Sequence, residues 1–238
     1  MEKQEQIVEM FNEIAPTYDK ANRFISFGID TSWRKKAVKI MLEKFRLKSI
    51  KIADVACGTG DMIGVWQEFA PKFDVKIEKL LGIDPSVGML DVAKKRFPDL
   101  EFIVAKADNT TLNNDFVDIL SISYGIRNVV KRAKALKEFN RVIKNGGYVV
   151  ILEFTKRQNS GFVDNVRDFY ISKILPKIGA FISKNRAAYE YLPNSIGNFL
   201  DKKSFVEELR CAGFEPEIVQ GFSFDVSTLF VAKKVKEI

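Results

Sequence analysis

The chain contains no histidine, and this absence removes the commonest general base of enzymes and the commonest metal ligand. Two cysteines, Cys57 and Cys211, are too few for a disulfide framework or a cysteine metal site, and they indicate a reducing compartment. No stretch reaches the roughly 18 uncharged apolar residues of a membrane span, and the charged start MEKQEQIVEM does not resemble a signal peptide. We therefore expect a cytoplasmic protein without a metal, in which Asp, Glu, Tyr, Lys, Arg or water moves any proton.

The composition is that of one packed domain, with 238 residues, 46% hydrophobic and 29% charged. The net charge is +7, and part of it forms a basic cluster near the N-terminal helical region. The cluster consists of Lys35, Lys36, Lys39, Lys44, Arg46, Lys48 and Lys51. Composition leaves three interpretations of this cluster open: a solvated surface, a surface that attracts an anionic membrane, or a surface that attracts nucleic acid.

Segments typical of strands and helices alternate through the middle of the chain. Strands are predicted at 51–56, 79–84, 101–105, 116–123 and 147–154, with helices at 60–70, 86–97 and 131–144. This alternation favours a parallel sheet with helices on both faces. A helix at 202–212 and strands at 214–220 and 226–234 follow, and their short connection requires the final strand to pair antiparallel. The prediction is a Rossmann-like α/β fold with a seven-stranded sheet and an antiparallel last strand.

Two regions stand outside this alternation. Residues 1–48 are predicted to form a helical cap, and residues 155–200 a helical insertion within the same single domain (1–238). Apolar residues recur with helical spacing from Phe162 to Phe181, and Pro176 should kink or break that segment. We interpret the insertion as a lid over an apolar substrate; a helix packed on the sheet is the alternative.

One short stretch, KIADVACGTGD from Lys51 to Asp61, predicts a strand, a glycine turn and the start of a helix. Gly58 and Gly60 let the backbone bend and approach a ligand closely, and the helix presents its free N–H groups there. Asp84 ends the next predicted strand, where a carboxylate accepts hydrogen bonds from both ribose hydroxyls. Together these features predict a site for an adenosine-type cofactor.

The residues around the glycine turn narrow the choice of cofactor. The phosphate-loop pattern GxxxxGK followed by Ser or Thr is absent, and GxGxxG fits poorly because Gly64 is the next glycine. Asp54 and Asp61 flank the turn and would repel a pyrophosphate, whereas they suit the sulfonium and ammonium groups of S-adenosylmethionine. The pattern resembles motif I of the class I methyltransferases, so Asp54, Gly58 and Gly60 are assigned to cofactor binding. A generic nucleotide-fold turn is the alternative.

Five ordered blocks, the glycine turn among them, resemble the UbiE/MenG quinone C-methyltransferases and cover nearly the whole chain. The N-terminal block, Phe11 to Lys35, matches the family's YDxxNxxxSFGxxxxWR pattern. Three more blocks are SISYGIRNV from Ser121 to Val129, RVIKNGGYVVILEF from Arg141 to Phe154, and YEYLPNSI from Tyr189 to Ile196. The resemblance implies methyl transfer from S-adenosylmethionine to a ring carbon of a polyprenyl quinol, demethylmenaquinol or a ubiquinol precursor.

The resemblance also implies positions that contact the cofactor, namely Thr59, Asp84, Asp108, Asn109 and Ser123. Asp108 and Asn109 follow the third strand, where they can pair with the adenine edge, although such a dipeptide is also typical of a plain turn. Ser123 ends the fourth strand, beside the expected methionine moiety.

Two positions depart from the family pattern. Asp30 stands where the family usually has histidine, so a histidine-dependent proton step is in doubt for this chain. Asn145 stands where the family usually has proline, which alters only a turn before Gly146 and Gly147.

Methylation of carbon requires a nucleophilic ring carbon, and loss of a phenolic proton pushes charge onto it. The site therefore needs a base or a cation that lowers the phenol pKa. Arg127 and Asn128 follow the fourth strand at the carboxyl edge of the sheet, and Arg127 is expected to stabilise the phenolate. Tyr18 and Asp19 are expected to close over the pocket, or else form a helix cap and a core aromatic. Glu153 is a reserve base.

Two other functions are weighed against this one. A nucleic-acid methyltransferase is supported only by the net charge, and the Asn/Asp-Pro-Pro-Phe/Tyr clamp of amino methyltransferases is replaced here by Ser121 to Tyr124. A cofactor-binding regulator would need the glycine turn but no quinol pocket. We therefore expect no nucleic-acid partner, and peripheral contact with the inner face of the cytoplasmic membrane. The quinone, its prenyl length and the oligomeric state, a homodimer included, stay open.

Overall fold

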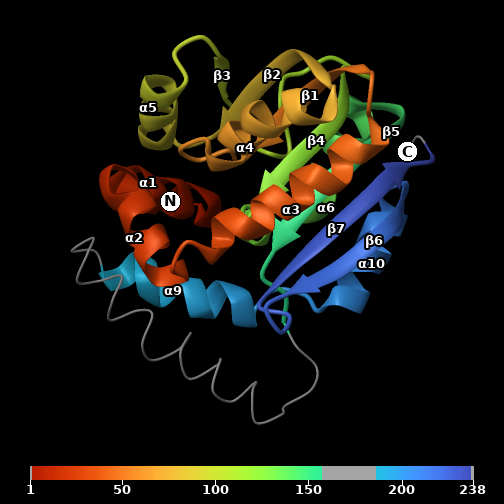
Figure 1. The fold of residues 1–238 in the computed structure, drawn as a ribbon. Coiled ribbons are helices and arrows are strands. Elements are labelled where there is room, and N and C mark those ends of the chain that lie inside the picture. Colours follow the sequence, from red (N-terminus) through yellow and green to blue (C-terminus); the bar gives the residue numbers. More distant parts are fainter. Residues whose placement is uncertain (1, 157–185, 237–238) are drawn as a thin grey trace.

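The computed structural model describes residues 2–156 and 186–236, and Figure 1 shows their arrangement. The segment from Phe162 to Phe181, predicted to be helical, lies outside the described residues, as do the side chains of residues 186–190. A seven-stranded sheet forms the centre, in the order β3-β2-β1-β4-β5-β7-β6. The strands are β1 (Ser49–Val55), β2 (Lys76–Asp84), β3 (Glu101–Val104), β4 (Val117–Ser123), β5 (Ile143–Glu153), β6 (Phe214–Phe222) and β7 (Ser227–Lys234).

The pairing of the strands follows the lengths of their connections. The first five strands pair in parallel, each joined to the next through a helix or a crossover. β7 pairs antiparallel with β6, because the four residues between them allow only a hairpin, and it also pairs antiparallel with β5. The predicted α/β fold with an antiparallel last strand is therefore confirmed.

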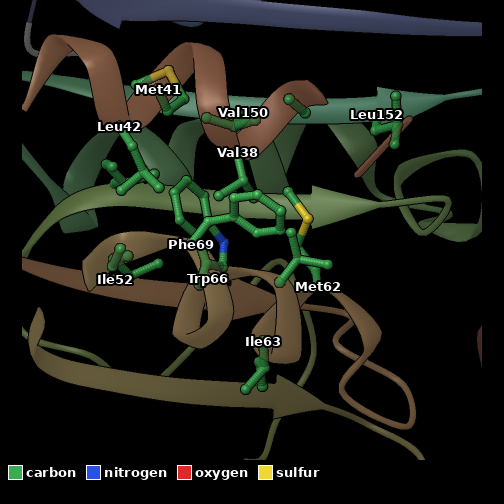
Figure 2. Packing of buried hydrophobic residues seen from close by; sticks show 14 of the residues in the cluster. Val38, Met41, Leu42, Ile52, Met62, Ile63, Trp66, Phe69, Val150 and Leu152 are labelled. Atoms are coloured by element: carbon green, nitrogen blue, oxygen red, sulfur yellow. The ribbon is translucent and has the colours of Figure 1, made fainter. Parts of the chain in front are cut away.

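Helices cover both faces of the sheet, and the strands are apolar on both sides as buried parallel strands require. On one face lie α3 (Ile29–Lys44) and α4 (Asp61–Phe69), and Figure 2 shows Trp66 and Phe69 of α4 beside Val38 and Leu42 of α3. On the other face lie α6 (Arg132–Val142) and α10 (Lys202–Cys211). α5 (Val87–Arg96) and the short helices η2 (Ala70–Phe73) and η3 (Ile126–Asn128) complete the alternation.

The N-terminal helices α1 (Lys3–Ile14) and α2 (Tyr18–Ser26), joined by η1 (Ala15–Thr17), pack beside α5 and α9 (Arg186–Gly197). Asn12 fixes α1 to the start of α5, because its Oδ1 accepts hydrogen bonds from Ser86 Oγ at 2.7 Å and from the Gly88 N–H at 3.0 Å. Gln4 Oε1 accepts from the Val130 N–H at 2.9 Å. These contacts hold α1 across the carboxyl edge of the sheet.

The predicted boundary between α6 and β5 is wrong in an informative way. The helix expected to reach residue 144 ends at Val142, and β5 begins at Ile143 rather than near 147. Ile143 already pairs with Val117, and the register then skips so that Ile119 faces Tyr148. The intervening residues bulge outward around Gly146, whose φ of 77° is one that glycine adopts without strain.

Candidate active site

A first cavity lies at the carboxyl ends of β1, β2 and β4, where parallel sheets of this type bind ligands. Its lining bounds about 720 Å³ of space free of protein atoms, part of it open to solvent. Gly58, Asp84, Asp108 and Ser123 line it, as do Ile7 and Phe11 of α1 and Met89 of α5. The cavity thus has an acidic floor and an apolar roof.

The glycine turn shapes the floor of this cavity. Gly58 has φ 55° and Gly60 φ 88°, values that side chains bearing a Cβ rarely adopt. A Cβ on Gly58 would meet nothing within 4 Å, so the backbone there faces open space that a ligand can fill. A Cβ on Gly60 would lie 2.7 Å from the Phe97 ring, so Gly60 instead permits close packing beneath the turn.

Asp84 ends β2 with its carboxylate buried beside the turn. Its Oδ2 accepts a hydrogen bond from the Gly58 N–H at 2.9 Å, and its Oδ1 accepts from the Ser86 N–H at 2.8 Å. Burial raises the pKa of Asp84 to about 6, against the lowering effect of these two backbone donors. Each oxygen keeps a second acceptor direction, so the carboxylate can receive the two hydroxyls of a ribose.

Asp54 is the most deeply buried acid near the turn. Its Oδ1 accepts from Ser121 Oγ at 2.6 Å, while its Oδ2 has no hydrogen-bond partner among the described residues. Burial raises the pKa of Asp54 to about 7. A buried acceptor without a partner costs free energy, and a cationic ligand nearby would relieve that cost by favouring the ionised carboxylate.

The remaining predicted cofactor residues fall into two groups. Ser123 and Asp108 line the first cavity, with Lys134 Nζ 3.4 Å from Asp108 Oδ2. Asn109 is exposed outside the lining and forms a turn with Lys106 through a 3.0 Å backbone hydrogen bond. Thr59 also lies outside the lining, in the turn itself.

Asp19, predicted to orient the acceptor, contacts the glycine turn instead. Its Oδ1 accepts from Thr59 Oγ1 at 2.6 Å, and its Oδ2 accepts from Arg96 Nη1 at 3.1 Å. Arg96 also donates to the Thr59 carbonyl at 2.9 Å. Asp19 is therefore placed to fasten α2 to the turn, and the structure does not bring it to the second cavity described next.

A second, larger cavity of about 1100 Å³ adjoins the first, and both are lined by Tyr18 and Tyr124. Its walls are largely apolar and come from α2, α3, α9 and the β6–β7 turn, with Ile25, Trp33 and Leu192 among them. The charged side chains of the described lining are two arginines and one carboxylate, Arg34, Arg127 and Asp30. A ligand in the first cavity and one in the second would therefore meet at the two tyrosines.

An aromatic stack between the arginines forms one wall of the second cavity. The Tyr124 and Phe154 rings stack with centroids 4.6 Å apart. The Arg34 guanidinium lies 5.0 Å from the Tyr124 ring centroid and Arg127 lies 5.5 Å from that of Phe154. Tyr124 has φ 58°, a strained value for a tyrosine, as is common at functional sites. Burial raises the pKa of the Tyr124 hydroxyl, so this group stays protonated and can donate.

Arg127 is held in place by buried partners. Its Nη1 donates to Glu153 Oε1 at 2.7 Å and to the Tyr124 carbonyl at 2.5 Å, and its Nε donates to Ser195 Oγ at 3.3 Å. Burial raises the pKa of Glu153 and Arg127 opposes this shift. Glu153 is fully buried behind Arg127 and outside the described lining, so it serves as an anchor for the guanidinium rather than a base at the cavity.

Of the other predicted catalytic residues, Asn128 lines the first cavity and Tyr18 lines both cavities. Asn128 Oδ1 accepts from the Tyr191 hydroxyl at 3.0 Å, which joins η3 to α9. Burial raises the pKa of Tyr18, against a hydrogen bond with Asn22 that lowers it. Tyr18 therefore presents a neutral hydroxyl between the cavities.

Asp30 and Arg34 are a buried pair that the sequence did not single out for catalysis. Asp30 accepts hydrogen bonds from Arg34, from Arg23 at 2.5 Å and from Ser26 Oγ at 2.7 Å. Burial by itself would raise the pKa of Asp30, but Arg34, Ser26 and Arg23 together hold it below its usual value. Asp30 is thus an ionised carboxylate at the second cavity, in the position where the family resemblance leads one to expect a histidine.

The residues fit S-adenosylmethionine on two structural grounds. The space above Gly58 is open, and a buried carboxylate oxygen of Asp54 lacks a partner among the described residues. Within the ranges 2–156 and 186–236, no group of three His, Cys, Asp or Glu side chains that could hold a metal ion is found. No helix of the described part is long and apolar enough to cross a membrane.

Comparison with known proteins identifies relatives over the full chain. The sequence model described as the ubiE/COQ5 methyltransferase family matches residues 1–234. A Campylobacter jejuni protein named ubiquinone/menaquinone biosynthesis C-methyltransferase UbiE is 60% identical, over 99% of this chain and 100% of that protein. A Thermotoga maritima protein named demethylmenaquinone methyltransferase is 36% identical, over 94% of each chain.

Solved structures with the same fold share little sequence with this chain. A SAM-dependent methyltransferase from Thermotoga maritima has a TM-score of 0.66 at 20% identity, over 96% of this chain and 99% of that one. At such low identity the likeness shows the fold alone.

Proposed function

The chain belongs to the ubiE/COQ5 methyltransferase family and is a SAM-dependent methyltransferase, and we propose that its acceptor is the ring carbon of a polyprenyl quinol. Demethylmenaquinol is the first candidate, since relatives that span the chain carry the name demethylmenaquinone methyltransferase. A ubiquinol precursor is the alternative, because the Campylobacter relative is named for both pathways. The observation that carries the proposal is the junction of an acid-floored cavity with a large apolar one at Tyr18 and Tyr124.

In the first cavity, Asp84 would hold the ribose, and Asp54, which is buried outside the described lining, would balance the positive charge of the cofactor. The Gly58 backbone would lie against it, and Asp108 and Ser123 would line its two ends. When bound, the cofactor supplies an electrophilic methyl group on a sulfonium. Thr59 and Asp19 would act indirectly, by keeping the turn in shape.

In the second cavity, Arg127 would stabilise the phenolate form of the quinol. A neutral hydroquinone carbon is a weak nucleophile, and a fixed guanidinium lowers the pKa of a phenol beside it. Glu153, Ser195 and the Tyr124 carbonyl hold the Arg127 side chain, so little reorganisation is needed when the charge develops. Arg34, stacked on Tyr124, adds a second cation to the same wall.

The ring proton must also leave. When the new carbon–carbon bond forms and the bond between sulfur and the methyl carbon breaks, the methylated ring carbon still carries its hydrogen. Loss of that proton restores the aromatic ring, and even a weakly basic carboxylate can accept it. Asp30 is the ionised carboxylate among the described lining residues, which makes it the candidate acceptor.

The apolar walls of the second cavity would receive the ring and the first part of the prenyl tail, and the rest of the tail would remain in a membrane. We therefore include peripheral contact with the cytoplasmic membrane surface in the proposal. Its support is the apolar cavity and the net charge of +7.

The proposal is tested by methyl transfer from labelled S-adenosylmethionine to reduced demethylmenaquinol, with a ubiquinol precursor and bulk RNA as parallel acceptors. Label in demethylmenaquinol supports the first candidate, and label in the ubiquinol precursor alone moves the activity to the other pathway. Label in RNA, with none in either quinol, would mean that the basic surface rather than the apolar cavity defines the acceptor. The oxidised quinone serves as the control, because it has no phenolic proton to lose.

A further inference from the structure

Large apolar side chains lie exposed beside the second cavity. Phe24 and Phe27 are 59% and 76% exposed at the end of α2, and Ile29 is 45% exposed at the start of α3. Phe224, in the β6–β7 turn, is 78% exposed. We call Phe24, Phe27, Ile29 and Phe224 the apolar rim. Clusters of exposed apolar residues of this kind mark interaction surfaces on soluble proteins.

The two segments of the rim are joined in space although about 190 residues separate them, since the Trp33 indole N–H donates to Ser223 Oγ at 3.2 Å. Figure 1 shows the α2–α3 junction and the β6–β7 turn on the same lower side of the molecule. Phe27 and Ile29 line the second cavity themselves, as does Ser223 next to Phe224. The cavity therefore reaches the surface at the rim.

The backbone is strained where it displays these rings. Phe27 has φ 51° and Phe224 φ 55°, in the left-handed region that costs a residue with a Cβ roughly 1–2 kcal/mol. Phe27 precedes Gly28, and together they end α2 through a hydrogen bond from the Gly28 N–H to the Arg23 carbonyl. A glycine or asparagine at position 27 would form this turn with less strain, and Phe27 is 76% exposed, so core packing does not account for the phenylalanine.

Positive side chains flank the rim. Lys20 is exposed on α2, and the exposed Lys36 has its Nζ 5.5 Å from the ring centroid of Phe222, two residues before Phe224. Both belong to a chain with a net charge of +7. Exposed aromatic rings with lysines nearby are suited to the boundary between lipid acyl chains and anionic headgroups.

We propose that the apolar rim inserts into the surface of a bilayer containing anionic lipid and opens the second cavity toward the acyl chains, so that a prenylated acceptor enters without crossing water. This inference rests on the proposed function for the identity of the acceptor, but the membrane contact itself does not depend on any reaction.

The test uses the full-length protein and flotation with vesicles of phosphatidylethanolamine and phosphatidylglycerol. The variant Phe24→Ser/Phe224→Ser changes two rim residues outside the described cavity lining, and each substitution should weaken vesicle binding by about tenfold, equivalent to about 1.4 kcal/mol. Leu47→Ser is the matched control, because Leu47 is 86% exposed and has φ 59°. It precedes β1 and so lies at the amino ends of the parallel strands, away from the rim. Equal binding by the rim variant and the control would overturn the proposal.

Two activity measurements separate this inference from the proposed function. With tailless 1,4-naphthoquinol in buffer, the rim variant should match the wild type. With long-chain demethylmenaquinol in vesicles, its rate should fall by about 100-fold, in line with the tenfold loss of binding expected from each of its two substitutions. A wild type that binds vesicles through the rim but methylates neither quinol would contradict the proposed function and leave the membrane contact supported. Rim-dependent binding to a protein fraction, with none to vesicles, would instead identify a protein partner and contradict the bilayer.

Discussion

Replacement of Asp84 by asparagine tests the assignment of the first cavity. The carboxylate already accepts the Gly58 and Ser86 N–H groups at 2.9 and 2.8 Å, and each oxygen retains one acceptor direction for a ribose hydroxyl. Asparagine keeps one acceptor oxygen but loses the other and the charge, so one ribose bond of roughly 1.5–3 kcal/mol is lost and the second is weakened. Cofactor binding should therefore weaken by at least about 2 kcal/mol, or about 30-fold in Kd.

The same substitution should change the stability of the cofactor-free protein much less. Burial lifts the pKa of Asp84 from 3.8 to about 6, a cost of about 3 kcal/mol for the ionised form, which asparagine does not carry. Against this gain, the asparagine amide turns donors toward the Gly58 or Ser86 N–H and loses one of those bonds, at roughly 1–3 kcal/mol. The two changes nearly cancel, so the thermal midpoint should stay within a few degrees.

Isothermal titration with S-adenosylmethionine at neutral pH measures the affinity. Asp118→Asn is the matched control, because Asp118 also accepts a backbone N–H, that of Lys51 at 2.8 Å, but lies near the start of β4 and away from the first cavity. A Kd for Asp84→Asn within about threefold of the wild type, or an equal loss in Asp118→Asn, would refute the ribose assignment.

Three further predictions follow from the contacts of the site. Burial raises the pKa of Asp54 to about 7 and that of Asp84 to about 6, and the bound cofactor favours both ionised forms. The affinity for S-adenosylmethionine should therefore be full above pH 7 and fall as the pH drops through 7 and 6. Titrations from about pH 5 to 8 that give a constant Kd would contradict this. Arg127→Lys keeps a positive charge near Glu153 but loses the guanidinium fork, so kcat should fall about 100-fold with cofactor Kd changed less than threefold; a parallel loss of cofactor affinity would make Arg127 structural. Asp19→Ala removes the 2.6 Å hydrogen bond from Thr59 and should raise the cofactor Kd about fivefold, with kcat at saturation unchanged. A loss of kcat with an unchanged Kd would mean that Asp19 acts on the acceptor after all.

The sequence predicted the elements of the fold because each carries a local signal. Apolar segments alternating with helical ones predicted the parallel strands. The short connection before Ser227 predicted the antiparallel pairing of β6 with β7 that the structure has. The start of β5 was missed because Ile143 continues an apolar helical pattern, and only its pairing with Val117 makes it a strand. Such pairing is a tertiary effect that overrides local propensity.

The two cavities differ in how much of them the sequence reveals. Gly58, Asp84 and Ser123 line the first cavity from the carboxyl ends of the neighbouring strands β1, β2 and β4, so a motif and its spacing were sufficient. The second cavity is assembled from α2, α3, α9 and the β6–β7 turn, which no local pattern relates to one another. Arg34 and Tyr124 lie inside blocks that match the family pattern, and this match was the sequence signal that could have identified them as site residues. Asp19 was assigned to the acceptor because its partner Thr59, forty positions away, is visible only in the folded chain.

The position of the transferred methyl group tests the central claim most directly. Reduced demethylmenaquinol is incubated with the enzyme and S-adenosylmethionine carrying a ¹³C methyl, and the product is examined by NMR. The account predicts a methyl carbon bonded to the ring carbon beside a hydroxyl, and loss of the ring proton at that position. A labelled methyl on oxygen would contradict the account, because the nucleophile stabilised by Arg127 and Asp30 would then be an oxygen rather than a carbon.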